Sequence, residues 1–198
     1  MKKSSVSLQV LKGAEIQPYI NIIAELRLLI FREYPYLYEG NFQDERNYLK
    51  MYYQSEKSFV ILALDGKKII GTATGVSFDR TPPEFRKTFS KNKIPIEGIF
   101  YSGELILLKE YRNKGIGSRL YEELEKLIRG KYKKIAICEL TKTKKDPKRP
   151  KDYVPSDIFW SKKGFIRYRQ LTMYTPWKEI GGRKKIRHTL VFSLKDIK

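Results

Sequence analysis

Two glycines one residue apart mark the place in this sequence where chemistry is easiest to foresee. They lie in ELILLKEYRNKGIGSR, residues 104–119, between an apolar run and the amphipathic pattern LYEELEKLIRG. Glycine weakens a helix, so Gly115 and Gly117 at a helix start indicate that something approaches the backbone closely. The first turn of a helix offers unpaired N–H groups and the positive end of a dipole, which together bind anions. The sequence therefore predicts a diphosphate site at this turn.

The residues around these glycines suit an anion and exclude two familiar nucleotide motifs. Arg112 and Lys114 add positive charge, and Ser118 adds a hydroxyl donor. A P-loop requires a lysine after its last glycine, and none follows Gly117. A dinucleotide fingerprint requires a third glycine where this chain has Leu120. A glycine turn that binds nothing is the alternative that the residues alone leave open.

Composition indicates a globular protein of the reducing cytoplasm. The 198 residues are 41% hydrophobic and 13% aromatic, which is too apolar for a disordered chain. No run approaches the roughly 20 apolar residues of a membrane span, and the first residues lack the apolar segment of a secretory signal. The one cysteine, Cys138, excludes an internal disulfide and suits a cytoplasmic location. With one histidine, His188, no metal site of ordinary composition is expected.

Positive charge is the strongest compositional feature, with a formal net charge of +19. Such a charge suits nucleic acid, an anionic membrane surface or an anionic cofactor. The densest cluster lies between residues 131 and 151, where it could contact a cofactor phosphate, RNA or only solvent. Its members are Lys131, Lys133, Lys134, Lys142, Lys144, Lys145, Lys148, Arg149 and Lys151.

The hydrophobic pattern predicts seven strands and four or five helices. Apolar residues recur at helical spacing in 16–34, 41–55 and 115–129, and a short helix is expected at 156–164. Strands are expected at 5–12, 58–64, 67–78, 99–108, 133–140, 165–176 and 186–196. Gly103 inside the fourth strand indicates a bulge or a close approach. We predict one α/β domain over residues 1–198, with a mixed, mostly antiparallel sheet flanked by helices on both faces.

Residues 104–117 resemble the core motif of the GNAT superfamily of N-acetyltransferases, in which [RQ]-x-x-G-x-[GA] opens a helix after the fourth strand. The segment FWSKKGF, residues 159–165, resembles that family's later Y-x-x-x-G-F motif. The resemblance implies the GNAT-like acyl-CoA N-acyltransferase fold, with acetyl-CoA as cosubstrate and no metal. It also implies that the loop amides bind the pyrophosphate and that the strand pairs with the pantetheine arm. The cofactor-binding residues would be Ile106, Leu107, Leu108, Arg112, Asn113, Lys114, Gly115, Ile116, Gly117, Ser118 and Trp160.

Acetyl transfer to an amine requires a neutral amine, a polarised carbonyl and a leaving thiolate that gains a proton. By resemblance, a backbone N–H at Ile106 or Leu107 stabilises the carbonyl oxygen. Glu104 lies on the same strand and is the expected base or substrate contact. A carboxylate that faces solvent or pairs with a nearby lysine is the alternative for Glu104.

The expected proton donor to the thiolate departs from the family pattern. The family places a tyrosine four residues before the glycine of G-F, and this chain has Trp160 there. An indole cannot protonate a thiolate, so Trp160 is expected to form part of a wall or of the core. Tyr153 and Tyr168 are the nearest phenols that could act instead, and departure of the thiolate unassisted into water is the other option.

The acceptor site is expected in FREYPYLYEGNFQDE, residues 31–45, which joins the first two helices. Acidic and aromatic residues gather there, and Glu33, Tyr36, Tyr38 and Glu39 would suit a cationic amine of a small molecule or a peptide. Aromatic packing of a long loop is the plainer interpretation. Two further functions stay open: nucleic-acid binding on the same scaffold, and acyl-CoA sensing without transfer. A second copy of the chain is also a partner to consider.

Overall fold

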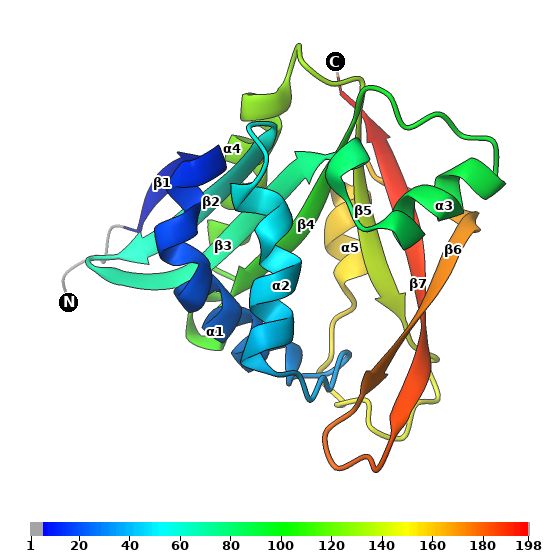
Figure 1. Ribbon diagram of the computed structural model, residues 1–198. Helices are drawn as coiled ribbons and strands as arrows, with labels where there is room; N and C mark the ends of the chain where they lie inside the picture. The colour runs from blue at the N-terminus through cyan, green and yellow to red at the C-terminus, as the bar shows by residue number, and fades with distance from the viewer. Residues whose placement is uncertain (1–5, 198) are drawn as a thin grey trace.

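A seven-stranded sheet runs through the residues that the computed structural model describes, 6–197 (Figure 1). The strands are β1 (Ser7–Lys12), β2 (Ser58–Asp65), β3 (Lys68–Ser77), β4 (Ile99–Leu107), β5 (Lys134–Thr141), β6 (Ile166–Lys178) and β7 (Lys185–Asp196). Their order in the sheet is β1-β2-β3-β4-β5-β7-β6, and all neighbours are antiparallel except β4 and β5. The mixed, mostly antiparallel sheet predicted from the sequence is confirmed.

Helices cover both faces of this sheet, as the sequence predicts. In Figure 1, α1 and α2 lie in front of the sheet and α4 and α5 behind it. The helices are α1 (Ile20–Phe31), α2 (Phe42–Tyr53), α3 (Pro83–Lys91), α4 (Ile116–Ile128) and α5 (Ser156–Lys162). Because side chains alternate along a strand, Val60 of β2 packs in the cluster beneath α1 and α2, whereas Ile61 packs in the one beneath α4. None of the described helices is both long and apolar enough to cross a membrane.

Prolines explain where the first helix differs from its predicted range. The expected helix over 16–34 begins as a 3₁₀ helix, Gly13–Tyr19, and becomes α-helical only at Ile20. Pro18 falls inside this 3₁₀ turn, where its missing N–H breaks no interior α-helical hydrogen bond. The α-helix ends at Phe31 because Tyr34 precedes Pro35, and a residue before proline disfavours helical geometry.

The parallel pair at the centre of the sheet separates halfway along its length. β4 and β5 pair only from Ile99 to Tyr101, opposite Lys134 to Ala136. Beyond Tyr101 the two strands no longer pair with each other, although β4 still pairs with β3 and β5 with β7, which leaves one edge of β4 free. The register of β4 against β3 shifts by one residue around Gly103, as the strand glycine predicts. A side chain at Gly103 would collide with the hydroxyl of Tyr52, so a close approach is confirmed as well.

The β6–β7 hairpin closes the chain across Gly181 and Gly182. Its far end extends beyond the sheet, where Figure 1 places it beside the loop that follows α1. The N–H of Glu39 donates to the carbonyl of Lys178 (2.8 Å), and the N–H of Ile180 donates to the carbonyl of Leu37 (2.7 Å). The α1–α2 loop is therefore joined to the hairpin by backbone hydrogen bonds.

Candidate active site

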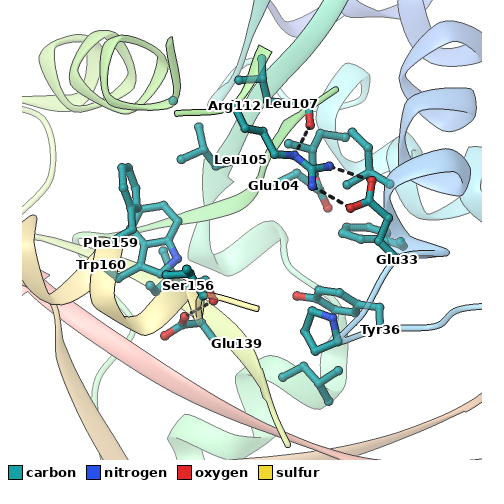
Figure 2. Close-up of a pocket in the computed structure, with 18 of the residues that line it drawn as sticks. Glu33, Tyr36, Glu104, Leu105, Leu107, Arg112, Glu139, Ser156, Phe159 and Trp160 are labelled. Carbon is teal, nitrogen blue, oxygen red and sulfur yellow. Dashed lines mark hydrogen bonds and ion pairs between the residues drawn. The ribbon is translucent and has the colours of Figure 1, made fainter. Parts of the chain in front are cut away.

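A cavity of about 660 Å³ opens where β4 and β5 separate. Its walls come from residues 102–107 of β4, 137–140 of β5, the loop after α1, the glycine turn before α4, and residues 153–160 around α5. Figure 2 shows side chains from these segments facing one another across the cavity. Residues far apart in the sequence thus meet at the gap in the sheet.

The free edge of β4 presents backbone groups to this cavity. The N–H of Leu108 donates to the carbonyl of Ile70 (2.9 Å), and the carbonyl of Ile106 points toward Gly71, so both residues face β3. Backbone groups alternate in direction along a strand, which turns the N–H and C=O of Leu105 and Leu107 toward the gap. Of the two amides expected to stabilise a carbonyl oxygen, that of Leu107 faces the gap and that of Ile106 faces β3.

The glycine turn leaves open space in front of the first amides of α4. Gly115 caps the helix with a φ of +78°, a left-handed conformation that favours glycine. A Cβ built on Gly115 or Gly117 would meet no other atom within 4 Å. Gly115, Gly117, Ser118 and Asn113 all line the cavity. The side chains that are absent at the two glycines therefore leave the helix N-terminus accessible from the cavity, as a diphosphate would require.

Arg112, expected to bind cofactor, turns away from this helix start. Its Nε donates to the carbonyl of Leu107 (2.8 Å), and its two terminal nitrogens donate to Glu33 at 2.6 and 2.9 Å. Figure 2 shows this fork joining the edge of β4 to the end of α1. Glu33 was expected on the acceptor side, so one ion pair links the two predicted halves of the site.

Glu104 forms the floor of the cavity and is held by three donors. One carboxylate oxygen accepts from the guanidinium of Arg27, and the other accepts from the hydroxyls of Thr74 and Tyr52, the latter at 3.1 Å. Arg27 also pairs with Glu45, and all three charged groups are buried. Burial alone would lower the pKa of Arg27, but the two carboxylates outweigh it and raise that pKa. One cation and two anions give this buried triad a formal charge of −1.

Glu139 of β5 is a second buried carboxylate at the cavity, and the sequence analysis did not single it out. It accepts from the hydroxyl of Ser156 at 2.8 Å (Figure 2). It also accepts from Arg167 at 3.3 Å. It lies three residues past Ala136, the last residue of β5 that pairs with β4. The sequence held one sign of this site: Glu139 is the single acidic residue in the apolar strand KIAICEL. Beside it, burial and then the charge of Glu139 raise the pKa of the Cys138 thiol.

Aromatic side chains complete the wall between these carboxylates. Figure 2 shows the hydroxyl of Tyr36 pointing into the cavity, and burial is the main cause that raises its pKa. Tyr153 also lines the cavity, packs edge-on against Tyr34 with ring centroids 4.6 Å apart, and has its pKa raised mainly by burial. Trp160 is buried against Tyr121 and contributes to the wall that α5 forms.

Six residues expected at the site lie outside the cavity lining: Tyr38, Glu39, Leu108, Lys114, Ile116 and Tyr168. Leu108 and Ile116 are buried in the apolar cluster that includes the inner face of α4, and Lys114 is exposed, with its ammonium 5.6 Å from the ring centroid of Tyr111. Tyr38 bridges to Glu179 of the hairpin, and Glu39 pairs with Lys178 at 3.2 Å. Tyr168 packs against the apolar cluster on the α1–α2 face of the sheet. Of the two phenols expected near the leaving thiolate, only Tyr153 reaches the cavity. No group of three or more possible metal ligands occurs among residues 6–197.

Comparison with known proteins finds one family and many similar folds. The model of the acetyltransferase (GNAT) family matches residues 23–147. An N-acetyltransferase from Staphylococcus aureus superimposes with a TM-score of 0.59 at 14% identity, over 97% of this chain and 99% of that one. Arabidopsis thaliana NAA60, solved with a bisubstrate analogue, gives 0.58 at 13% identity, over 97% and 100%. The Escherichia coli ribosomal-protein-S18-alanine N-acetyltransferase gives 0.58 at 10% identity, over 98% and 94%. No curated protein matches the sequence significantly.

Proposed function

The chain belongs to the acetyltransferase (GNAT) family, and on that premise we propose that it transfers an acetyl group from acetyl-CoA to the primary amine of a cationic acceptor. Membership of the family supports an N-acetyltransferase enzyme; the donor, the amine and its charge are the proposal. The observation that carries it is the cavity at the separation of β4 and β5, which joins an open helix N-terminus to an acidic and aromatic chamber. A cytoplasmic location is part of the same proposal.

The residues on the cosubstrate side fit acetyl-CoA. The open space at Gly115 and Gly117 would accommodate the diphosphate against the first amides of α4, with Ser118 as a further donor. The N–H and C=O of Leu105 and the N–H of Leu107, which face the gap between β4 and β5, would bind the amide-bearing arm as an added strand does. Trp160 would form the apolar wall of this arm. Acetyl-CoA, when bound, supplies the activated acyl group.

Charge on the other side of the cavity supports a cationic acceptor. The buried triad of Arg27, Glu45 and Glu104 carries a formal charge of −1 next to the cavity in a chain whose net charge is +19. Glu139 adds a second carboxylate, which pairs with the partly exposed Arg167. An ammonium group would be attracted to these charges and to the ring of Tyr36.

The chemistry requires a group that takes a proton from the amine, and Glu139 is the carboxylate best placed to do so. Both oxygens of Glu104 already accept hydrogen bonds from Arg27, Thr74 and Tyr52. Both oxygens of Glu33 accept hydrogen bonds from the guanidinium of Arg112. Glu139 accepts one hydroxyl hydrogen bond and one longer bond from Arg167, so it keeps free lone pairs.

Several further groups would assist the transfer. We assign proton removal to Glu139 through Ser156, with Glu104 as a fixed charge that attracts the ammonium. The N–H of Leu107 would stabilise the carbonyl oxygen as negative charge develops on it. The phenol of Tyr153 or that of Tyr36 would protonate the leaving thiolate in place of the tyrosine that Trp160 replaces.

Calorimetric titration with acetyl-CoA tests the proposal, beside a Gly117→Trp variant whose indole fills the open space. We expect binding by the wild type and a loss of about 100-fold or more in the variant, since the phosphates lose their cradle. Lys126→Trp, on an exposed position of the same helix, is the control and should bind like the wild type. Equal affinities in all three proteins would contradict the predicted anion site.

A panel of amines with acetyl-CoA then tests the acceptor class. The panel includes spermidine, free lysine and a short peptide that begins with alanine, because one structurally similar enzyme is an alanine N-acetyltransferase. We expect cationic amines to be preferred over neutral ones such as aniline, measured as release of the CoA thiol. Binding of acetyl-CoA without acetylation of any amine would favour the acyl-CoA sensor instead.

A further inference from the structure

Glu179, just past the end of β6, is a buried carboxylate that the proposed chemistry does not use. It is only 5% exposed, although it lies in the connection between two strands that extend away from the sheet. It does not line the cavity. Three segments meet around it: the β6–β7 hairpin, the α1–α2 loop, and residues 141–154, which we call the basic segment.

Two lysines of the basic segment neutralise this carboxylate. Lys142 donates to one oxygen at 2.5 Å and Lys148 donates to the other at 2.6 Å. Burial would raise the pKa of Glu179, but the hydrogen bonds from the two lysines outweigh it and lower that pKa. Lys142 also lies 3.7 Å from Asp146 of the same segment. This segment is therefore not the freely solvated loop that its composition suggests.

The basic segment leads directly into one wall of the cavity, on the side proposed to bind the acceptor. Tyr153 is its penultimate residue and lines the cavity, and Ser156, the partner of Glu139, follows two residues after its end. Fixing Lys142 and Lys148 on the hairpin thus limits how far Tyr153 and Ser156 can move from the cavity.

The same hairpin holds the wall that carries Tyr36, which meets the first wall where Tyr34 packs on Tyr153. The indole N–H of Trp177 donates to the carbonyl of Tyr36 at 3.1 Å, and Tyr38 forms a β-bridge with Glu179 itself. His188 stacks on Trp177 with ring centroids 3.5 Å apart, which fixes the indole. Tyr36, whose hydroxyl points into the cavity, is therefore held by the strand that precedes Glu179.

We propose that Glu179 is a positioning residue for the acceptor: it fixes the separation between the wall that carries Tyr36 and the wall that carries Tyr153 and Ser156. It acts through these residues and does not touch the substrate. The inference rests on the proposed function, because it assumes that the acceptor amine binds between these walls. Loss of its charge would leave two lysines without their shared partner and release the basic segment.

Glu125 of α4 provides a matched comparison. It is also a largely buried carboxylate bound to a lysine, Lys195, at 2.5 Å, and its side chain is 15% exposed against 6% for Glu179. Its partners lie on α4 and β7, and Glu125 does not line the cavity. A general loss of stability would affect variants of both residues, whereas a loss of positioning would affect only the Glu179 variant.

Steady-state kinetics of Glu179→Gln and Glu125→Gln test this proposal, with acetyl-CoA and the best amine of the panel. We expect the acceptor KM to rise about tenfold in Glu179→Gln, while kcat stays within about threefold, because a loosened wall weakens binding more than chemistry. The Kd for acetyl-CoA should be unchanged, and Glu125→Gln should keep the wild-type acceptor KM. Glu179→Asp should recover part of the loss, since it keeps the charge.

Hydrogen exchange supplies a readout that needs no acceptor. In Glu179→Gln, exchange should quicken in residues 34–39 and in the basic segment together, and in neither segment in Glu125→Gln. An unchanged acceptor KM, or exchange that rises in neither segment, would overturn the proposal. If the wild type binds acetyl-CoA but acetylates no amine, the proposed acetylation fails, and exchange still decides whether Glu179 holds the two walls.

Discussion

The two halves of the cavity are built in different ways. The cosubstrate half comes largely from one continuous stretch, residues 105–118, which supplies a free strand edge, a glycine turn and a helix start. The acceptor half is assembled from segments around residues 33–36, 139 and 153–156, and is supported by Arg27 and Glu179 from elsewhere in the chain. The first half depends on backbone groups and open space, whereas the second depends on buried charged side chains and their partners.

This difference predicts different sensitivities to substitution. A backbone site is damaged chiefly by filling its space, and its own side chains can vary. A site of buried charges is damaged by removing one member, because the partners are then left uncompensated in a medium that solvates them poorly. Substitutions that remove charge should therefore affect the acceptor half strongly and leave acetyl-CoA binding largely intact.

The largest effect is expected at the floor of the acceptor half. Arg27→Leu leaves Glu45 and Glu104 buried without their cation, and we expect the free energy of unfolding to fall by about 3–5 kcal/mol. Urea denaturation measures the change. Arg129→Leu is the control, because Arg129 is exposed and its contact with Glu125 is long, at 3.4 Å. The loss of this surface pair should alter the free energy of unfolding by less than about 1 kcal/mol. Equal losses in both variants would mean that the triad contributes no special stability.

The next largest effect is on the rate. Glu139→Gln keeps the hydrogen bond to Ser156 possible but removes the proton acceptor, and we expect kcat to fall by about 100- to 1,000-fold. The Kd for acetyl-CoA should not change. Glu122→Gln, on the exposed side of α4, should retain full activity. A Glu139→Gln enzyme within about threefold of the wild-type kcat would return the role of base to Glu104.

The same difference explains what the sequence could predict. The strand, turn and helix around Gly115 are local, so hydrophobic period and glycine spacing were sufficient to place them. Gly103 also predicted its bulge correctly, because a glycine inside a strand usually marks a bulge or a close approach of another group. Trp160 could be placed in a wall because only four positions separate it from Gly164, just past the end of α5, so the spacing is local.

The acceptor half was less predictable because its partners are distant in the sequence. Glu104 pairs with Arg27 across 77 positions, and Lys148 pairs with Glu179 across 31, which no local pattern encodes. Tyr38 and Glu39 were expected at the site on composition, yet the hairpin draws both out of the cavity lining. A loop rich in acidic and aromatic residues shows that a site is near without showing which of its residues face it.

The link between the two halves can be tested with a smaller effect. In Glu33→Gln the guanidinium of Arg112 loses its carboxylate and becomes available to a diphosphate at the neighbouring turn. We expect acetyl-CoA to bind about three- to tenfold more tightly, measured by calorimetry. Glu110→Gln, a nearby exposed carboxylate paired with Lys68, is the control and should change the affinity little. Weaker binding in Glu33→Gln would mean that the ion pair instead holds the turn in its binding geometry.

The smallest effect concerns pH at the support of the acceptor half. Burial is the main cause that lowers the pKa of His188 from its usual 6.5; Lys142 and Lys148 act in the same direction, whereas Glu179 and the carbonyl of Trp177 oppose them. The unfolded chain therefore takes up a proton at His188 at a higher pH than the folded chain does. It follows that this residue makes stability decline as the pH falls below about 6.5.

His188→Phe isolates this contribution, because a phenyl ring can keep the stack on Trp177 but cannot titrate. Between pH 7.5 and 5.5 the urea midpoint of the wild type should decline more than that of the variant. The pKa of Glu179 is lowered from 4.5, so its own proton uptake falls below this window and does not obscure the comparison. Parallel declines in the two proteins would show that His188 takes up its proton equally in the folded and unfolded states. Because His188 stacks on Trp177 and Trp177 holds Tyr36, a larger decline in the wild type would show that an acid-sensitive group lies at the support of the acceptor wall.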